Sequence, residues 1–216
     1  MSFSNVFMQL GAGMLISVSI YALTLLFAIP LALPLALSRM SKRKALRFPA
    51  AAYISFLRGT PLMLQILVVY FGPWYLLRIQ IDFSYKLYAV VIAFALNYAA
   101  YFAEIYRAGI ESIPLGQREA AQVLGYTKSQ AFCRVILPQV VKRILPPMAN
   151  EAITLIKDTS LAFAIGVMDM FTYARQIASA QKSMLPLIAA AAFYYVFNLA
   201  VAWAFGRFEK RLSYYR

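Results

Sequence analysis

The sequence predicts an all-α integral membrane protein with five transmembrane helices and one long cytoplasmic loop. Hydrophobic residues make up 62% of the 216 residues and charged residues only 13%, whereas a soluble domain has roughly 45–50% apolar and about 25% charged residues. Apolar runs recur at about the 20-residue length that a helix needs to cross a bilayer core. The basic residues are concentrated in alternate connections between these runs, as the positive-inside rule requires.

Four of the five expected spans are long apolar runs. Their ranges are 11–37, 59–77, 87–106 and 183–206. The first contains two prolines, which transmembrane helices tolerate because neighbouring groups satisfy the freed carbonyls. The third extends past Glu104. The remaining span, 144–168, is interrupted by Glu151 and by Lys157–Asp158, and it is therefore expected to face the protein interior rather than lipid.

The charge distribution also predicts an orientation. The connections 39–47 and 107–143, the segment after Gly206 and Arg58 hold 16 of the 21 basic residues, and the opposite side holds four. The basic side is expected to be cytoplasmic, so the N-terminus is expected outside and the C-terminus inside. Residues 1–216 are interpreted as a single multi-pass domain. The net charge of +13 is attributed to this orientation and not to a nucleic-acid partner.

The composition argues against a membrane enzyme. The sequence has no histidine and a single cysteine, Cys133, so it lacks the usual proton shuttle and any internal disulfide. It offers no catalytic constellation and no expected metal site. A phosphate-binding G-x-x-x-x-G-K-[ST] loop is also missing from the sequence, so no ATP hydrolysis and no cofactor are expected in this chain.

The loop at about 111–138 carries its own helix signals. A short helix is expected over 117–124, because Gly125 follows it as glycines do at helix ends. Thr127–Gln130 has the form of a capping box that opens a second short helix, which Pro138 is expected to end. Two short helices at a glycine joint suit docking into a groove of a soluble partner. The alternative is a helical hairpin that lies on the membrane surface.

The same loop resembles the conserved loop of ABC importer permeases. Glu119-Ala120-Ala121 is followed by Gly125 and by Ile136-Leu137-Pro138. More narrowly, the chain resembles the polar amino acid permeases, the histidine/glutamine/arginine/opine group. The other matching segments are Arg58–Pro61, Asn97, Ala100-Tyr101, Ala103–Ile105, Arg107–Ile110 and Lys157–Leu161. The resemblance implies that Glu119, Ala120, Ala121 and Gly125 belong to coupling helices that dock on an ATP-binding subunit.

The resemblance implies a type I ABC importer that carries a polar L-amino acid, or a derivative such as cystine or an opine, across a bacterial cytoplasmic (inner) membrane. This chain would be its transmembrane subunit. A dimer of ATP-binding subunits, which hold ATP and Mg²⁺, would drive transport. A second copy or a sibling permease would complete the path within the lipid, and an extracytoplasmic solute-binding protein would deliver the solute. The alternative is an ATP-independent carrier or channel for small polar solutes.

Polar residues inside the expected spans are the candidates for the substrate pathway. In the third span Asn97, Tyr101 and Glu104 share one helical face, where oxygen acceptors could receive a substrate ammonium. The alternative is that Glu104 pairs with Arg107.

Further candidates lie in the fourth and second spans. Lys157, Asp158, Thr159 and Ser160 interrupt the fourth span with one cation, one anion and two hydroxyls, which match an amino acid head group. A helix broken at mid-membrane is a frequent device for binding polar solutes. The alternative is a structural Lys–Asp pair across a dimer. Arg58–Pro61 is interpreted first as a helix start, and Thr60 and Gln65 could also face the pathway.

Overall fold

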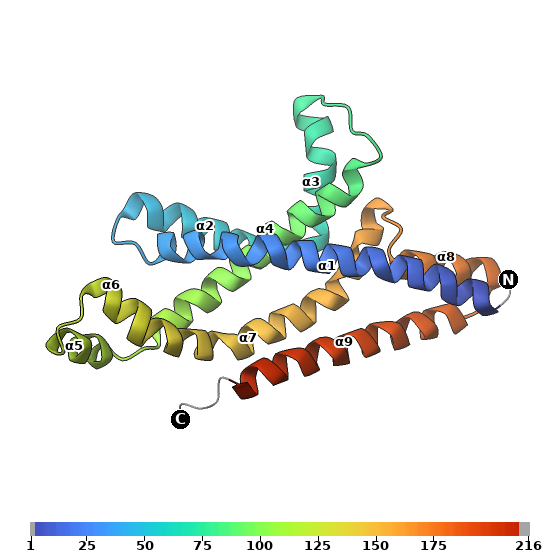
Figure 1. Ribbon diagram of the computed structural model, residues 1–216. Helices are drawn as coiled ribbons and strands as arrows, with labels where there is room; N and C mark the ends of the chain where they lie inside the picture. Colours follow the sequence, from blue (N-terminus) through green and yellow to red (C-terminus); the bar gives the residue numbers. More distant parts are fainter. Residues whose placement is uncertain (1–2, 212–216) are drawn as a thin grey trace.

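The computed structural model describes residues 3–211, and the regular structure in that range is entirely helical. The elements are α1 (Phe3–Arg39), α2 (Lys44–Gly59), α3 (Leu62–Leu77), α4 (Tyr85–Glu111), α5 (Leu115–Val123), α6 (Lys128–Ala131), the π-helical segment η1 (Phe132–Ile136), α7 (Leu137–Asp158), the 3₁₀ segment η2 (Thr159–Ile165), α8 (Met170–Gln181) and α9 (Leu185–Arg211). α1, α7 and α9 run along the molecule, α3 stands away from it, and α5 and α6 lie at one end (Figure 1). The chain ends that the sequence assigns to opposite sides, 1–2 and 212–216, lie outside the described residues.

Three helices of the described chain, α1, α4 and α9, are each long and apolar enough to cross a membrane. α2 and α3 meet the same criteria only together, as one span bent by 110°. α7 is the remaining expected span. Its 22 residues include five charged ones, so its place in the membrane depends on protein or water around it and not on apolarity. The expected membrane boundaries themselves stay predictions.

The second expected span needs a correction at its start. The expected span covers 59–77 and leaves 48–58 without an expected element, whereas a 16-residue helix, α2, occupies Lys44–Gly59 and α3 begins at Leu62, just after the helix start expected at Arg58–Pro61. The break arises because Pro61 disfavours helical backbone in the preceding residue, and Thr60 is extended at φ −117° and ψ 147°. The basic residues at the start of α2 conceal its helical pattern, in which Ala50 and Ile54 are buried one turn apart.

The end of the coupling loop, residues 111–138, also needs a correction. Pro138 was expected to end the second short helix, but α6 continues through η1 directly into α7. Pro138 is the second residue of α7 and follows the π-helical segment η1 directly, so an irregular helical turn accommodates the proline and the helix does not end there. α7 therefore begins at Leu137, ahead of the expected start at residue 144.

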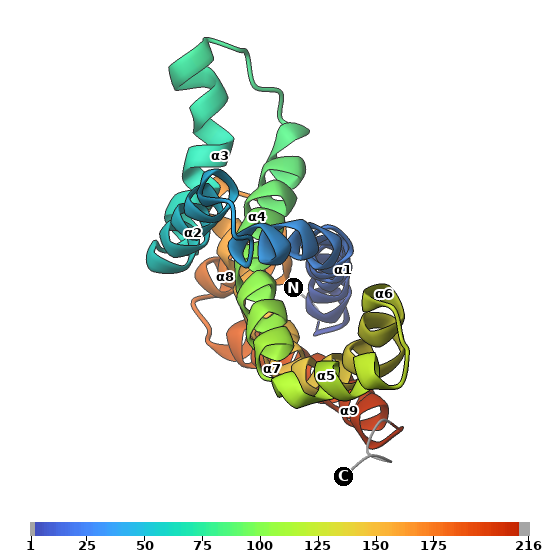
Figure 2. The same cartoon turned by 90° about the vertical axis from the view of Figure 1, so that its left-hand side faces the viewer.

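α4 is the central helix, and small residues allow its neighbours to come close. It contacts α1, α2, α3 and α7 (Figure 2). On α1, Ala28, Ala32 and Ala36 lie one turn apart and are fully buried; small side chains of this kind let helix backbones approach in a membrane. Gly109 of α4 lies directly against Ile144 of α7, where a Cβ would collide. This packing fixes the positions of α2, α4 and α7, which together line a cleft.

Candidate substrate cleft and docking surface

An amide network holds the broken span onto α4. The Gln65 side-chain nitrogen donates to the Thr60 hydroxyl at 2.8 Å and to the Leu57 carbonyl at 2.9 Å. The Asn97 side-chain nitrogen donates to the Gln65 oxygen and to the Leu57 carbonyl, both at 3.0 Å. Gln65 and Asn97 are 8% and 4% exposed. The polar groups of three predicted pathway residues, Thr60, Gln65 and Asn97, thus form hydrogen bonds that join the α2–α3 break to α4.

A cleft of about 510 Å³ opens beside this network, between the end of α2 and the facing sides of α4 and α7. Its lining residues are Arg58, Tyr101, Glu104, Ile105, Ala108, Gly109, Ser112, Arg143, Pro147 and Glu151. Two predicted pathway residues, Tyr101 and Glu104, lie in it. The Arg58 guanidinium lies 5.1 Å from the centroid of the Tyr101 ring, a cation–π distance that holds this base at the cleft.

The Glu104 carboxylate is neutralised within the chain. Arg107 lies 2.6 Å from one of its oxygens, and Arg39 of α1 lies 3.7 Å from the other. Arg107 also pairs with Glu111 one turn further on. The structure therefore contains the pair with Arg107 that was the alternative interpretation. Arg39 and Arg107 form ion pairs with the carboxylate that is expected, from the sequence, to receive a substrate ammonium.

Glu151 is the functional candidate that the sequence analysis missed as a site. It lines the cleft, is half-buried, and belongs to none of the ion pairs found between described residues. Arg58 and Arg143 are the bases that line the same cleft. The sequence does contain a signal for this residue, which is an acidic side chain within an apolar segment. Acidic residues inside membranes usually line a path or pair internally.

The four fourth-span candidates do not form one site. The Asp158 carboxylate accepts a hydrogen bond from the Tyr98 hydroxyl at 2.7 Å. The hydroxyls of Thr159 and Ser160 donate to backbone carbonyls of the preceding turn, at 2.8 and 2.7 Å. Lys157 is exposed. The α-helix does end at Asp158, where an interruption is expected, but the chain continues without a turn into the 3₁₀ segment η2.

The chain turns instead at Gly166, which follows η2. Its φ of +70° is left-handed, a conformation that glycine adopts without the steric cost of a Cβ. Hydroxyl groups that bond to the preceding helical turn, as those of Thr159 and Ser160 do, allow the helix to tighten without leaving polar groups unpaired.

One side of α7 is exposed along most of its length. Arg143, Pro147, Asn150, Thr154 and Lys157 are all exposed and recur at spacings of four and three, which places them on one helix face. At 1.5 Å per residue this face extends about 21 Å. We call it the open face of α7. Within the membrane, its polar residues and Lys157 would be costly against lipid, so the face suits water or another protein chain.

The coupling loop has the predicted local structure. Ala121 of α5 is buried, whereas Glu119 and Ala120 are exposed. Gly125 is left-handed at φ +80°. The predicted capping box is confirmed, since the Gln130 backbone N–H donates to the Thr127 hydroxyl and the Thr127 N–H donates to the Gln130 side-chain oxygen.

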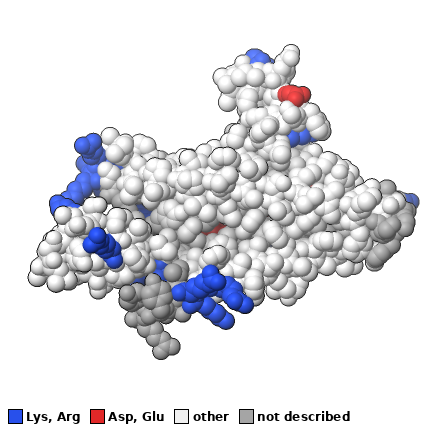
Figure 3. Space-filling model, in the orientation of Figure 1, with Lys and Arg blue, Asp and Glu red and all other residues white. Residues whose placement is uncertain are grey.

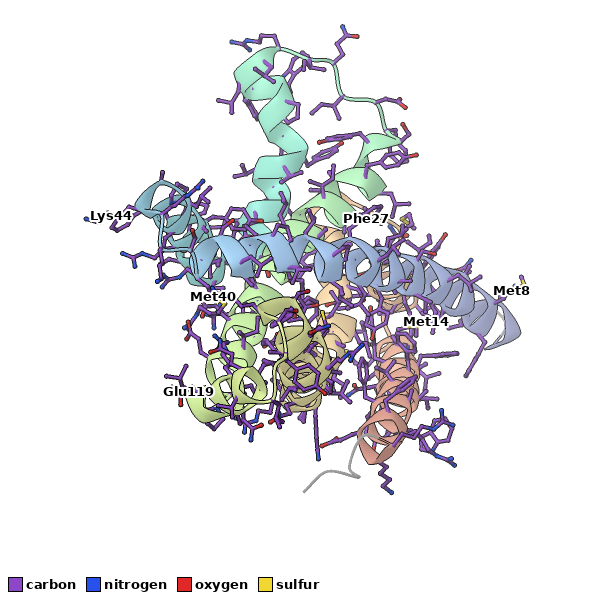
Figure 4. The ribbon with its side chains drawn as sticks, turned by 60° about the vertical axis from the view of Figure 1, so that its left-hand side comes forward. Met8, Met14, Phe27, Met40, Lys44 and Glu119 are labelled. Carbon is purple, nitrogen blue, oxygen red and sulfur yellow. The ribbon has the colours of Figure 1, made fainter. Side chains whose placement is uncertain are left out.

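This loop also exposes large apolar side chains. Leu115, Val123 and Leu124 are 66%, 88% and 77% exposed, at the end of the molecule where Glu119 points outward (Figure 4). Lys and Arg gather at the start of α2 and, nearer the lower centre of the view, at the end of α9, while the body of the molecule between its two ends is largely uncharged (Figure 3). Large apolar side chains exposed together on one short loop are typical of a surface that a soluble partner covers.

Comparison with known proteins identifies the family. The family model for the binding-protein-dependent transport system inner membrane component matches residues 28–214. The chain is 42% identical to the L-cystine transport system permease protein TcyL of Bacillus subtilis (strain 168), over 94% of this chain and 87% of the relative. It is 38% identical to the arginine transport system permease protein ArtQ of the same organism, over 93% and 91%.

Solved structures give the same fold. A chain of an amino acid ABC transporter, solved by crystallography with histidines, has a TM-score of 0.88 at 34% identity over 97% of both chains. A chain of the inward-facing MetNI methionine ABC transporter has a TM-score of 0.78 at 16% identity, over 99% of this chain and 100% of that one, and supports the fold alone. This chain therefore belongs to the binding-protein-dependent transport system inner membrane components and has the all-α fold of a type I ABC importer permease.

Proposed function

We propose that this chain is the transmembrane subunit of an ATP-driven importer that carries a polar L-amino acid or a close derivative into the cell. The open face of α7, with the cleft beside it, is the observation that carries the proposal. A charged and polar face about 21 Å long has no place against lipid, but it suits the wall of a hydrated passage.

The passage is completed by a second permease subunit. A single chain leaves the open face of α7 uncovered, so a second copy or a sibling permease is needed to enclose it. Related by a two-fold axis, two such faces would oppose one another with like charges at equal depth. Because like charges repel, this arrangement favours a water-filled path between the two helices over direct contact.

The side chains of the cleft and of the open face suit an amino acid head group. Arg58 and Lys157 are cations that can receive a carboxylate, and Glu151 can receive an ammonium. Asp158, which the Tyr98 hydroxyl holds, offers a second anion. The names of the relatives, a cystine permease and an arginine permease, support this substrate class.

Energy enters through the coupling loop. We infer that a dimer of ATP-binding subunits, which hold ATP and Mg²⁺, docks on α5 and α6. The exposed Leu115, Val123 and Leu124 would fill an apolar groove, and Glu119 would add a charged contact. Closure of the partner on ATP would then move α6, η1 and α7 together, because these elements form one continuous helical segment.

The orientation follows from the charges. The coupling loop and the basic ends of α1 and α9 are placed in the cytoplasm, with the N-terminus outside and the C-terminus inside. A solute-binding protein is placed at the opposite face, where it delivers the amino acid. An ATP-independent carrier would have no use for the exposed apolar surface of the coupling loop.

Reconstitution tests the proposal. Liposomes that contain the chain, its ATP-binding subunits and its solute-binding protein are expected to accumulate a labelled polar amino acid. This accumulation should require ATP on the side of the bilayer that carries the ATP-binding subunits. Glu119→Lys is expected to reduce this uptake by more than about tenfold, because it reverses a charge at the docking surface, while the protein still inserts. Equal uptake without nucleotide, or undiminished ATP-driven uptake in Glu119→Lys, would contradict the proposal.

A further inference from the structure

The turn between α1 and α2 carries a concentrated and unneutralised positive charge. Lys42, Arg43, Lys44 and Arg47 lie within six residues, and the first 81 residues of the sequence contain no acidic residue. Lys42, Arg43 and Lys44 are exposed. The ion pairs found in the described chain all involve Glu104 or Glu111 and none of these four bases. We call residues 42–47 the basic turn.

The basic turn is separate from the surface assigned to the ATP-binding subunits. Lys44 lies at the outer end of α2, well away from Glu119 on α5 (Figure 4). The two regions are also apart in Figure 1, where the start of α2 and α5 lie on different sides of the end of α1. The basic turn is therefore available to a partner other than the one that covers the coupling loop.

An apolar track leads away from the basic turn along α2. Phe48, Ala52 and Phe56 recur every four residues and are exposed, the two phenylalanines by 61% and 65%. They cover about 12 Å of helix. The opposite side of α2, with Ala50 and Ile54, is buried against the protein. The Arg47 guanidinium lies 5.6 Å from the Phe48 ring centroid. The last base of the basic turn is therefore adjacent to the first residue of the apolar track.

We propose that the basic turn and this track bind an anionic glycerophospholipid such as phosphatidylglycerol. The phosphate group lies among Arg43, Lys44 and Arg47, and one acyl chain lies along Phe48, Ala52 and Phe56. Basic clusters beside a transmembrane helix attract anionic headgroups, and arginine binds phosphate oxygens in a bidentate manner. The inference rests on the membrane placement of α2 and on no particular transported solute.

The combination of features selects a lipid over other anions. Free phosphate would use the bases but would gain nothing from 12 Å of exposed apolar track. An acidic protein surface would use the bases, but the track lies on the span itself, where acyl chains are the neighbours. A zwitterionic lipid would fit the track and would lose the net attraction of the basic turn.

Native mass spectrometry of the intact importer complex, extracted in mild detergent, tests the proposal by counting bound lipids. Compared with the wild type, K42Q/R43Q/K44Q is expected to retain about tenfold less phosphatidylglycerol. The control R207Q/K210Q/R211Q removes the same charge from the end of α9 and is expected to retain it within about twofold of wild type. K42R/K44R keeps the charge and is expected to retain the lipid, which separates charge from folding.

The track and the source of the phosphate are tested in the same assay. Phe56→Ala is expected to lower phosphatidylglycerol retention by a few-fold with no change of charge. Soluble glycerophosphoglycerol, added in excess, is expected to leave the lipid in place. Equal loss in both glutamine triple variants, or displacement by the soluble headgroup, would overturn the proposal. So would loss of the ATP-binding subunits from K42Q/R43Q/K44Q with the lipid retained, which would assign the basic turn to a protein contact.

Discussion

The amide network and the substrate cleft are neighbouring groups of polar residues that differ in how their polar atoms are satisfied. The Gln65 amide donates to the Thr60 hydroxyl and to the Leu57 carbonyl, and the Asn97 amide donates to the Gln65 oxygen and to the same carbonyl. Arg58 and Glu151 line an open cleft, and Glu151 belongs to no ion pair of the described chain. A polar residue within a span is therefore evidence of a pathway only when its own chain leaves it unsatisfied.

The largest effect on transport is expected from Glu151→Gln. It removes the charge of the open cleft but keeps the side-chain shape, so ATP-driven uptake should fall by about a hundredfold or more through loss of a charge-assisted contact to substrate. Thermal stability should stay within about two degrees. Uptake into liposomes and thermal denaturation of the purified complex measure the two quantities.

The matched control for Glu151→Gln is Glu209→Gln, at an exposed position near the end of α9. It makes the same chemical change outside the cleft and should leave uptake unchanged. A Glu151→Gln complex that transports normally would remove the cleft from the pathway.

Asn97→Leu should show the opposite pattern. It leaves the Gln65 oxygen without its donor in a buried site, which costs about 1–3 kcal/mol. At about 2–4 °C per kcal/mol for a chain of this size, the melting temperature should fall by several degrees, and uptake per folded complex should change little. Gln176→Leu, at an exposed amide of α8, is the control. A stable Asn97→Leu complex with reduced uptake would move Asn97 into the pathway.

Tyr98→Phe should decide to which of the two groups Asp158 belongs. It removes the hydroxyl that donates to Asp158 at 2.7 Å and leaves the ring in place. If the Asp158 carboxylate contacts the substrate, the loss of this hydrogen bond leaves it poorly oriented, and uptake should fall by about tenfold. The free energy of unfolding should change by about 1 kcal/mol. Tyr195→Phe, at an exposed position of α9, should change neither. Lowered stability with normal uptake would place Asp158 among the structural residues.

The smallest effect on transport is expected from Glu104→Gln. Arg107 and Arg39 already neutralise this carboxylate, so uptake should change by less than about threefold. The melting temperature should fall by a few degrees, because a partly buried ion pair loses one partner. Substrate uptake and thermal denaturation again provide the readouts, and a tenfold loss of uptake would show that Glu104 contacts the substrate.

Local patterns predicted much of this fold. The apolar runs that became α1, α4 and α9, the break at Gly125 and the capping box of Thr127 and Gln130 follow from hydropathy and from interactions within a few residues. α2 was missed because its basic start resembles a loop. The continuity of α6 with α7 was missed because a proline within a helical pattern usually ends the helix, whereas here the π-helical segment η1 precedes Pro138 and the helix continues.

The candidate site was less predictable, because polar satisfaction depends on tertiary contacts. Sequence identifies Gln65 and Asn97 as polar residues in apolar spans, but their mutual bond joins residues 32 positions apart. The pairing of Glu104 with Arg39 likewise joins α1 to α4. Glu151 differs from these residues only in what the fold leaves beside it, and no local pattern carries that information.

Cysteine accessibility shows whether the open face of α7 lines a hydrated path. The single native cysteine is first replaced by Cys133→Ser, and Asn150→Cys and Thr154→Cys are compared with Val196→Cys, which is exposed on the apolar surface of α9. A charged, membrane-impermeant thiol reagent is expected to label positions 150 and 154 in the assembled importer, with protection by the transported amino acid, and to leave position 196 unlabelled. Labelling at 196 alone, or equal and unprotected labelling at all three positions, would show that the open face of α7 does not line the transport path.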